Sequence, residues 1–249
     1  MRSLTIGAWL VAAMAGPATA QELVEPAARE VLERMGTHLT GLQAYELTAD
    51  TGMEIVLDTD QKLLVGGTAV YHVRQPNRLK VELRTDVAQR EFFFDGTSAT
   101  YVSPGDGFYA QVADAPATIG EMLEHAAQRH GLAFPVADLL AWNSGAEWMG
   151  RITEGFRVGQ TRIGDVVADH WAYRIDNQDL ELWIPVEGSP LPLRISTVDR
   201  QDLTHPRFTA TLSWNEAADP ADAIFSFTPA EGMMAIPLAS TDLALEAPR

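Results

Sequence analysis

The stretch Arg78–Thr85 (RLKVELRT) alternates charged and apolar side chains residue by residue. Because successive side chains of a strand point to opposite faces, Leu79, Val81 and Leu83 share one face and the charged residues share the other. The alternation therefore predicts a strand with one buried face and one solvent-facing face, which is typical of an antiparallel sheet.

Similar runs recur on both sides of this stretch, separated by turn signals such as Pro76-Asn77 and Asp95-Gly96. A sheet of about 10–12 such strands tends to curl on itself. We expect the other strands at about 43–57, 62–74, 90–95, 98–102, 107–112, 151–160, 166–175, 179–185, 192–200 and 206–215, with a last short strand at Phe225–Phe227.

Three segments have helical periodicity instead. Residues 26–39 begin with a proline and repeat apolar side chains at helical spacing. Thr118 and Glu121 resemble a capping box that opens a second helix, which ends at Gly131, and Pro135 opens a short third helix to about Trp142. The predicted fold is α+β: a large curled antiparallel sheet, or half-open β-barrel of about 10–12 strands, with helices as a lid over an apolar cavity.

Composition excludes several classes of function. The chain has 249 residues, with 18 Lys+Arg, 34 Asp+Glu and no cysteine. The absence of cysteine excludes disulfides, thiol nucleophiles and thiolate metal sites. The net charge of −16 disfavours nucleic acids and anionic membrane surfaces as partners, because both require basic side chains to meet phosphates.

The first residues have the pattern of a secretory signal peptide. A positive start precedes the apolar run Leu4–Ala15, which Gly16-Pro17 ends, and Ala18-Thr19-Ala20 offers a cleavage site. We expect residues 1–20 to be a signal peptide cleaved near Ala20, 21–234 to be a single domain and 235–249 to be a loosely ordered tail. These features predict a periplasmic protein without a transmembrane segment after cleavage.

The sequence carries no recognisable catalytic motif. No His-Glu-x-x-His pair, Gly-x-Ser-x-Gly elbow, phosphate loop or dinucleotide fingerprint is present. We therefore expect no metal, no cofactor and no enzymatic activity, although catalytic groups that are distant in sequence can meet in a fold.

Apolar side chains of the strands and of the covering helices are the candidates for a ligand cavity, because a curled sheet under a lid can enclose more space than side chains fill. The alternative for each of them is plain core packing. The candidates on strands are Leu79, Val81, Leu83, Phe92 and Phe94, and those on helices are Met122, Leu123, Leu139 and Leu140.

Three motifs occur in order along the chain: Arg74–Leu79 (RQPNRL), Phe94-Asp95-Gly96 and Phe225–Pro229 (FSFTP). With them the chain resembles the periplasmic lipoprotein-carrier superfamily of LolA/LolB type. The segments Ile119–Leu140, Asp179–Ile184 (DLELWI) and Leu191–Arg194 (LPLR) are similar to a narrower family of predicted periplasmic proteins of unknown function, whose fold is similar. The resemblance implies an open barrel with a helical lid over an apolar cavity. It also makes Arg74 and Gln75 candidates for a lid latch, although Gln75 stands where the carriers have an arginine.

The resemblance and the predicted fold favour a soluble periplasmic protein that binds or carries a lipid, an acyl chain or a lipoprotein in an apolar cavity. The alternative is an envelope module that uses the same fold to bind a protein partner or to sense a ligand, without transport. A hydrolase is a distant third, and it requires acids or histidines that converge in the cavity.

Overall fold

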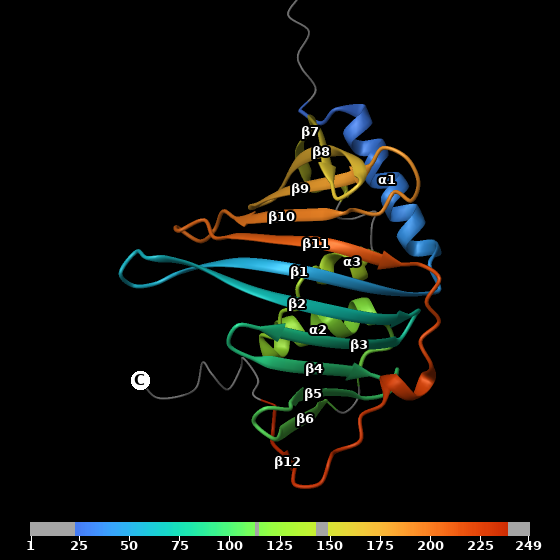
Figure 1. Ribbon diagram of the computed structural model, residues 1–249, viewed down its shortest axis with the longest axis vertical. Helices are drawn as coiled ribbons and strands as arrows, with labels where there is room; N and C mark the ends of the chain where they lie inside the picture. Colours follow the sequence, from blue (N-terminus) through green and yellow to red (C-terminus); the bar gives the residue numbers. More distant parts are fainter. Residues whose placement is uncertain (1–22, 113–114, 143–148, 239–249) are drawn as a thin grey trace, which may run out of the picture.

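The computed structural model describes residues 23–112, 115–142 and 149–238. Their strands form one sheet (Figure 1). The strands are β1 (Ala44–Val56), β2 (Lys62–Arg74), β3 (Arg78–Thr85), β4 (Gln89–Phe94), β5 (Ala99–Ser103), β6 (Phe108–Val112), β7 (Ile152–Ile163), β8 (Val166–Ile175), β9 (Gln178–Pro185), β10 (Arg194–Asp199), β11 (Arg207–Asn215) and β12 (Met234–Ala235).

The strand order is β12-β6-β5-β4-β3-β2-β1-β11-β10-β9-β8-β7. Two antiparallel meanders, β1–β6 and β7–β11, meet where β1 pairs with β11. The short β12 pairs with β6 in parallel. Since β12 and β7 are the two edges of the described sheet, the sheet stays open, and the predicted half-open barrel is confirmed.

Helices cover one face of this sheet. They are α1 (Pro26–Gly41), α2 (Ile119–His130) and α3 (Ala137–Leu140). In Figure 1, α2 and α3 lie behind the sheet, and α1 runs along one side of it. The chain passes through α2 and α3 between the two meanders, which places these helices across the concave face.

Local sequence explains the bounds of α2. The hydroxyl of Thr118 accepts a hydrogen bond from the Glu121 amide (3.3 Å), and the Glu121 carboxylate accepts one from the Thr118 amide (3.2 Å). Gly131 ends the helix in the left-handed conformation at φ 64°. The predicted capping box and stop are confirmed. The next helix is shorter than expected, because Val136 takes φ 51° and helical geometry begins only at Ala137.

The core lies between the concave face and the helices. Alternate residues of β1 to β4, such as Leu47, Tyr71, Leu79 and Phe92, are buried there. Two tyrosines satisfy their hydroxyls on the helical layer: Tyr173 donates to the Ala28 carbonyl (3.0 Å), and Tyr71 donates to the Pro135 carbonyl. These bonds tie the sheet to the layer that covers it.

The predicted last strand at Phe225–Phe227 is wrong. Phe225 ends the 3₁₀ helix Asp222–Phe225 and is buried, and the ring of Phe227 packs against Phe93 and Tyr109 (centroids 5.4 and 5.3 Å away). Phe93 points away from Phe92 and Phe94, so this segment crosses the outer face of the sheet. A sheet face offers no free strand edge to pair with, so this segment is held by side-chain packing, with the Phe227 ring tilted by 44° against Phe93 and 50° against Tyr109.

The chain reaches a free edge only afterwards, where Met234 and Ala235 pair with β6 and the Ile236 amide donates to the Tyr109 carbonyl (2.9 Å). The predicted signal peptide and the last part of the predicted tail, residues 239–249, lie outside the described residues. Within the described part of the chain, no helix is long and apolar enough to cross a membrane.

Candidate functional site

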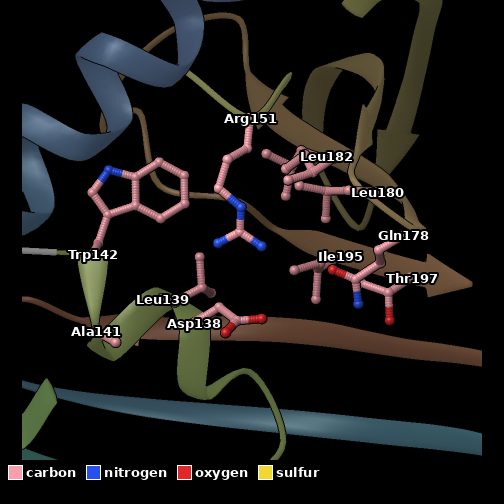
Figure 2. Close-up of a pocket in the computed structure, with 11 residues that line it drawn as sticks. Asp138, Leu139, Ala141, Trp142, Arg151, Gln178, Leu180, Leu182, Ile195 and Thr197 are labelled. Atoms are coloured by element: carbon pink, nitrogen blue, oxygen red, sulfur yellow. The ribbon is translucent and has the colours of Figure 1, made fainter. Parts of the chain in front are cut away.

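A recess of about 230 Å³ opens between α3 and strands β9 and β10 (Figure 2). Most of its wall is apolar, and four polar side chains join it. The apolar side chains are Leu139, Ala141, Trp142, Ile175, Leu180, Leu182 and Ile195, and the polar ones are Asp138, Arg151, Gln178 and Thr197.

The sheet forms one wall of this recess through its regular register. Leu180 and Leu182 lie two residues apart on β9 and therefore share a face. On β10, Ile195 lies opposite Leu182 and Thr197 lies opposite Leu180. The four side chains form two cross-strand pairs on the concave face, and Leu139 of α3 covers them.

The polar part of the recess centres on Arg151. Its Nε donates to Asp176 (2.6 Å), an ion pair on the exposed side. Figure 2 shows the guanidinium extending into the recess between Trp142 and Leu180, above Asp138. The Asp138 carboxyl is surrounded by protein, yet it stays accessible from the space inside the recess. Burial raises the pKa of Asp138, and the charge of Arg151 offsets part of the increase.

A second recess of about 660 Å³ adjoins the first and lies between α2 and α3. Asp138, Ala141 and Arg151 line both recesses, so the two spaces meet at these side chains. Gln75 and Leu123 are among the other residues that line the second recess. A third, smaller recess of about 150 Å³ lies over β3, β4 and β5, where Phe134 packs on Phe92 (4.9 Å between centroids).

The structure distributes the predicted cavity residues over these spaces. Leu139 lines the first recess and Leu123 the second, and Val81, Leu83 and Phe92 line the third. The remaining four lie in the packed core: Leu79, Phe94, Met122 and Leu140.

Of the two latch candidates, Arg74 contacts the C-terminal segment. Its Nη1 lies 2.5 Å from Asp222 and its Nη2 lies 2.8 Å from Asp219. Gln75 borders the second recess. Next to it, the Pro76 carbonyl accepts a hydrogen bond from the Ile119 amide (2.9 Å), so a main-chain bond joins this strand end to the first residue of α2.

None of the four polar residues Asp138, Arg151, Gln178 and Thr197 was expected at the site from the sequence. The alternation of residues 179–185 is as clear as that of 78–85, and it could have nominated Leu180 and Leu182. No local pattern marks Arg151, which directly precedes β7. It reaches the recess because β7 pairs with β8 and β8 pairs with β9.

One group of polar side chains resembles a hydrolase triad in composition. His38, Ser189 and Glu216 meet beside α1: the His38 Nε2 lies 2.6 Å from Glu216 and 3.2 Å from Ser189. In a Ser-His-acid relay the acid and the serine must contact different ring nitrogens. Here both face the same one, so this group fastens α1 to two loops and forms no relay.

In the described part of the chain, no group of three or more His, Asp or Glu side chains is arranged to hold a metal ion. The recess between α3 and β9–β10 offers apolar burial along its wall and hydrogen bonding at its polar side chains.

The model of a family described as "Predicted periplasmic protein (DUF2092)" matches residues 28–239. This match confirms the resemblance to a predicted periplasmic family that the segments Ile119–Leu140 and Asp179–Ile184 indicate. No curated protein matches the chain.

Several solved structures are similar to the chain. The lipoprotein LppX of Mycobacterium tuberculosis is 17% identical, with 78% of this chain and 98% of that chain covered and a TM-score of 0.49. LprF of Mycobacterium bovis is 12% identical, with 85% and 99% covered and a TM-score of 0.46. A LolA superfamily protein from Nitrosomonas europaea is 11% identical, with 80% and 97% covered and a TM-score of 0.41.

Proposed function

The chain belongs to this family of predicted periplasmic proteins, and from that premise we propose that it binds the acyl chain of a lipid or lipoprotein in the recess between α3 and β9–β10. The observation that carries the proposal is the lining of this recess, where an apolar wall ends in a small group of polar side chains.

The apolar wall suits hydrocarbon. Each methylene that leaves water contributes about 0.8 kcal/mol, so an acyl chain gains from the faces of Leu180, Leu182 and Ile195. The volume of about 230 Å³ exceeds the roughly 150 Å³ of an engineered apolar cavity that binds benzene. The recess is therefore large enough for a hydrocarbon segment.

The polar end suits the head of such a ligand. Arg151 offers hydrogen-bond donors, and Asp138 offers an acceptor. An ester or amide next to the acyl chain would find partners there, which orients the ligand with its hydrocarbon toward the leucines.

Export is part of the same proposal. Residues 1–20 would direct the chain to the periplasm and be cleaved near Ala20. A water-filled compartment between two membranes is where an acyl chain needs a protein to shield it.

The test is native mass spectrometry of the mature protein purified from its own periplasm, followed by solvent extraction. A mass increment that resolves into acyl chains supports the proposal. The variant Thr197→Trp, which fills the recess, should lower the affinity for an acylated peptide about tenfold or more. The matched control is Thr211→Trp, because Thr211 lies on the adjacent strand and alternates with the inward-facing Ala210 and Leu212.

Equal affinity of Thr197→Trp and the parent protein would contradict the assignment of the site. Absence of any acyl binding by the parent would contradict the function itself.

One observation favours the envelope interaction module as a second candidate. Apolar side chains are exposed along the edge hairpin β7–β8, including Phe156, Val158 and Val166. An edge strand with an apolar surface is a template for pairing with another chain. If a stable partner complex is lost in Phe156→Thr while acyl binding is absent in all variants, this second function replaces the first.

A further inference from the structure

Apolar side chains are exposed on one face of the hairpin β1–β2. The exposed fractions of Met53, Ile55 and Leu63 are 51%, 42% and 40%. Met53 and Ile55 lie two residues apart on β1, and Leu63 lies directly opposite Ile55 on β2, so the three side chains share a face. In Figure 1 this hairpin extends beyond the ends of the neighbouring strands.

The register of the sheet connects this face to the recess. Leu180, which lines the recess, lies opposite Thr197, and Thr197 lies opposite Phe208 of β11. Phe208 lies opposite Met53, and Met53 lies opposite Val65. Residues directly opposite in register lie on the same face, so one row runs along the concave face from the recess onto the hairpin. At about 4.8 Å per strand, Met53 is roughly 10 Å from Thr197.

The recess is smaller than a long acyl chain requires. Pockets that enclose a drug-sized ligand begin at roughly 300 Å³, and this recess has a volume of about 230 Å³. The second recess joins this one only at Asp138, Ala141 and Arg151, on the side of the head. A long chain with its head at Arg151 and its hydrocarbon along the leucines would therefore extend past Thr197, toward the row that leads to Met53.

The opposite face of the hairpin carries charged side chains together with the exposed Leu64, and the tip is charged. Glu54 and Lys62 form an ion pair (3.4 Å), and Asp58 and Asp60 are exposed at the turn. Carboxylates at the tip make insertion into a bilayer costly. Leu64 is a single exposed apolar side chain on the opposite face, whereas Met53, Ile55 and Leu63 form a group on the concave face, so a hydrocarbon finds its continuous apolar surface there.

We propose that the concave face of the β1–β2 hairpin, formed by Met53, Ile55, Leu63 and Phe208, extends the acyl-binding site and holds the part of a long chain that the recess does not enclose. This inference rests on the proposed function. The expected ligands are acyl chains that are longer than the recess, and their distal methylenes lie against these four side chains.

The experiment compares octanoyl and hexadecanoyl forms of one soluble peptide by isothermal titration calorimetry with the mature protein. The variant Met53→Thr/Ile55→Thr/Leu63→Thr removes the apolar face and keeps residues that are tolerated in strands. The matched control is Leu64→Thr, because Leu64 is 71% exposed on the opposite face of the same hairpin. Circular dichroism verifies that each variant is folded.

The expected result is that the parent binds the hexadecanoyl peptide at least about tenfold more tightly than the octanoyl peptide, and that the triple variant loses most of this difference. Octanoyl binding should stay within about twofold in all variants, and Leu64→Thr should match the parent. An unchanged chain-length preference in the triple variant overturns this inference and leaves acyl binding in place. Loss of vesicle binding in the same variant, with the chain-length preference retained, would assign the hairpin to a membrane surface instead. Absence of binding for both peptides overturns the proposed function as well.

Discussion

Asp138 and Arg151 line both the recess against β9–β10 and the recess between α2 and α3, so the two spaces share one carboxyl and one guanidinium. Burial raises the pKa of Asp138, and Arg151 counteracts the increase. A ligand that enters either recess therefore meets both charged side chains.

The pKa of Asp138 predicts a pH-dependent stability. A carboxyl whose pKa is raised in the folded state binds more protons there than in the unfolded chain, so its ionisation destabilises the fold as pH rises above about 4. Asp138→Asn should therefore unfold at a higher temperature than the parent at pH 7. Solvent in the recess screens the charge, so the gain in free energy of unfolding should stay below about 1 kcal/mol.

Thermal denaturation of both proteins between pH 3 and pH 8 measures this effect. The two curves should converge below the ordinary pKa of a carboxyl and separate as pH rises. A constant difference across this range would show that Asp138 does not titrate with a raised pKa.

The capping box of α2 predicts a second effect. Thr118→Ala removes the acceptor for the Glu121 amide and should lower the free energy of unfolding by about 1 kcal/mol. Thr118→Ser keeps the hydroxyl and should lie close to the parent. Chemical denaturation measures both values, and hydrogen exchange at Glu121 reports whether the loss is local to the first turn of α2.

Two adjacent glycines in β2 give a paired test of strand packing. A Cβ at Gly67 would lie 2.7 Å from the Arg84 carbonyl oxygen, whereas at Gly66 the nearest atom, an Asp86 carboxylate oxygen, would be 3.6 Å away. Gly67→Ala should therefore destabilise the protein by roughly 1–3 kcal/mol, and Gly66→Ala should be neutral or slightly stabilising. Equal unfolding midpoints for the two variants in urea would contradict the register of β2 against β3.

The ion pairs of Arg74 hold the C-terminal segment on the outer face. Arg74→Ala removes its contacts with Asp219 and Asp222 and should cost about 1 kcal/mol, more at low salt than at high salt. Limited proteolysis should then cut near residues 219–228 earlier than in the parent. Since this segment lies on the face opposite the recess, acyl affinity should not change, and a large loss of affinity would show that Arg74 acts as a latch of the site.

Local patterns predicted most of the elements because each depends on neighbours in the chain. The alternation of Arg78–Thr85 matches strand β3 residue for residue, and Thr118, Glu121 and Gly131 set the two ends of α2. Side-chain direction followed from the same period, since Phe92 and Phe94 point inward and Phe93 outward. The error at Phe225–Phe227 arose because three residues of strand-like composition carry no information about whether a strand edge is within reach.

The sequence by itself determined the period of each element, its caps and the family to which the chain belongs, because these depend on residues close together or on motifs in order. Only the tertiary structure decided that β11 pairs with β1, that Arg151 and Asp138 meet at one recess, and that Met53 continues a row from Thr197. The physical reason is that such contacts join residues far apart in the chain. Their free energy comes from burying two surfaces together, and no single stretch of sequence contains both surfaces.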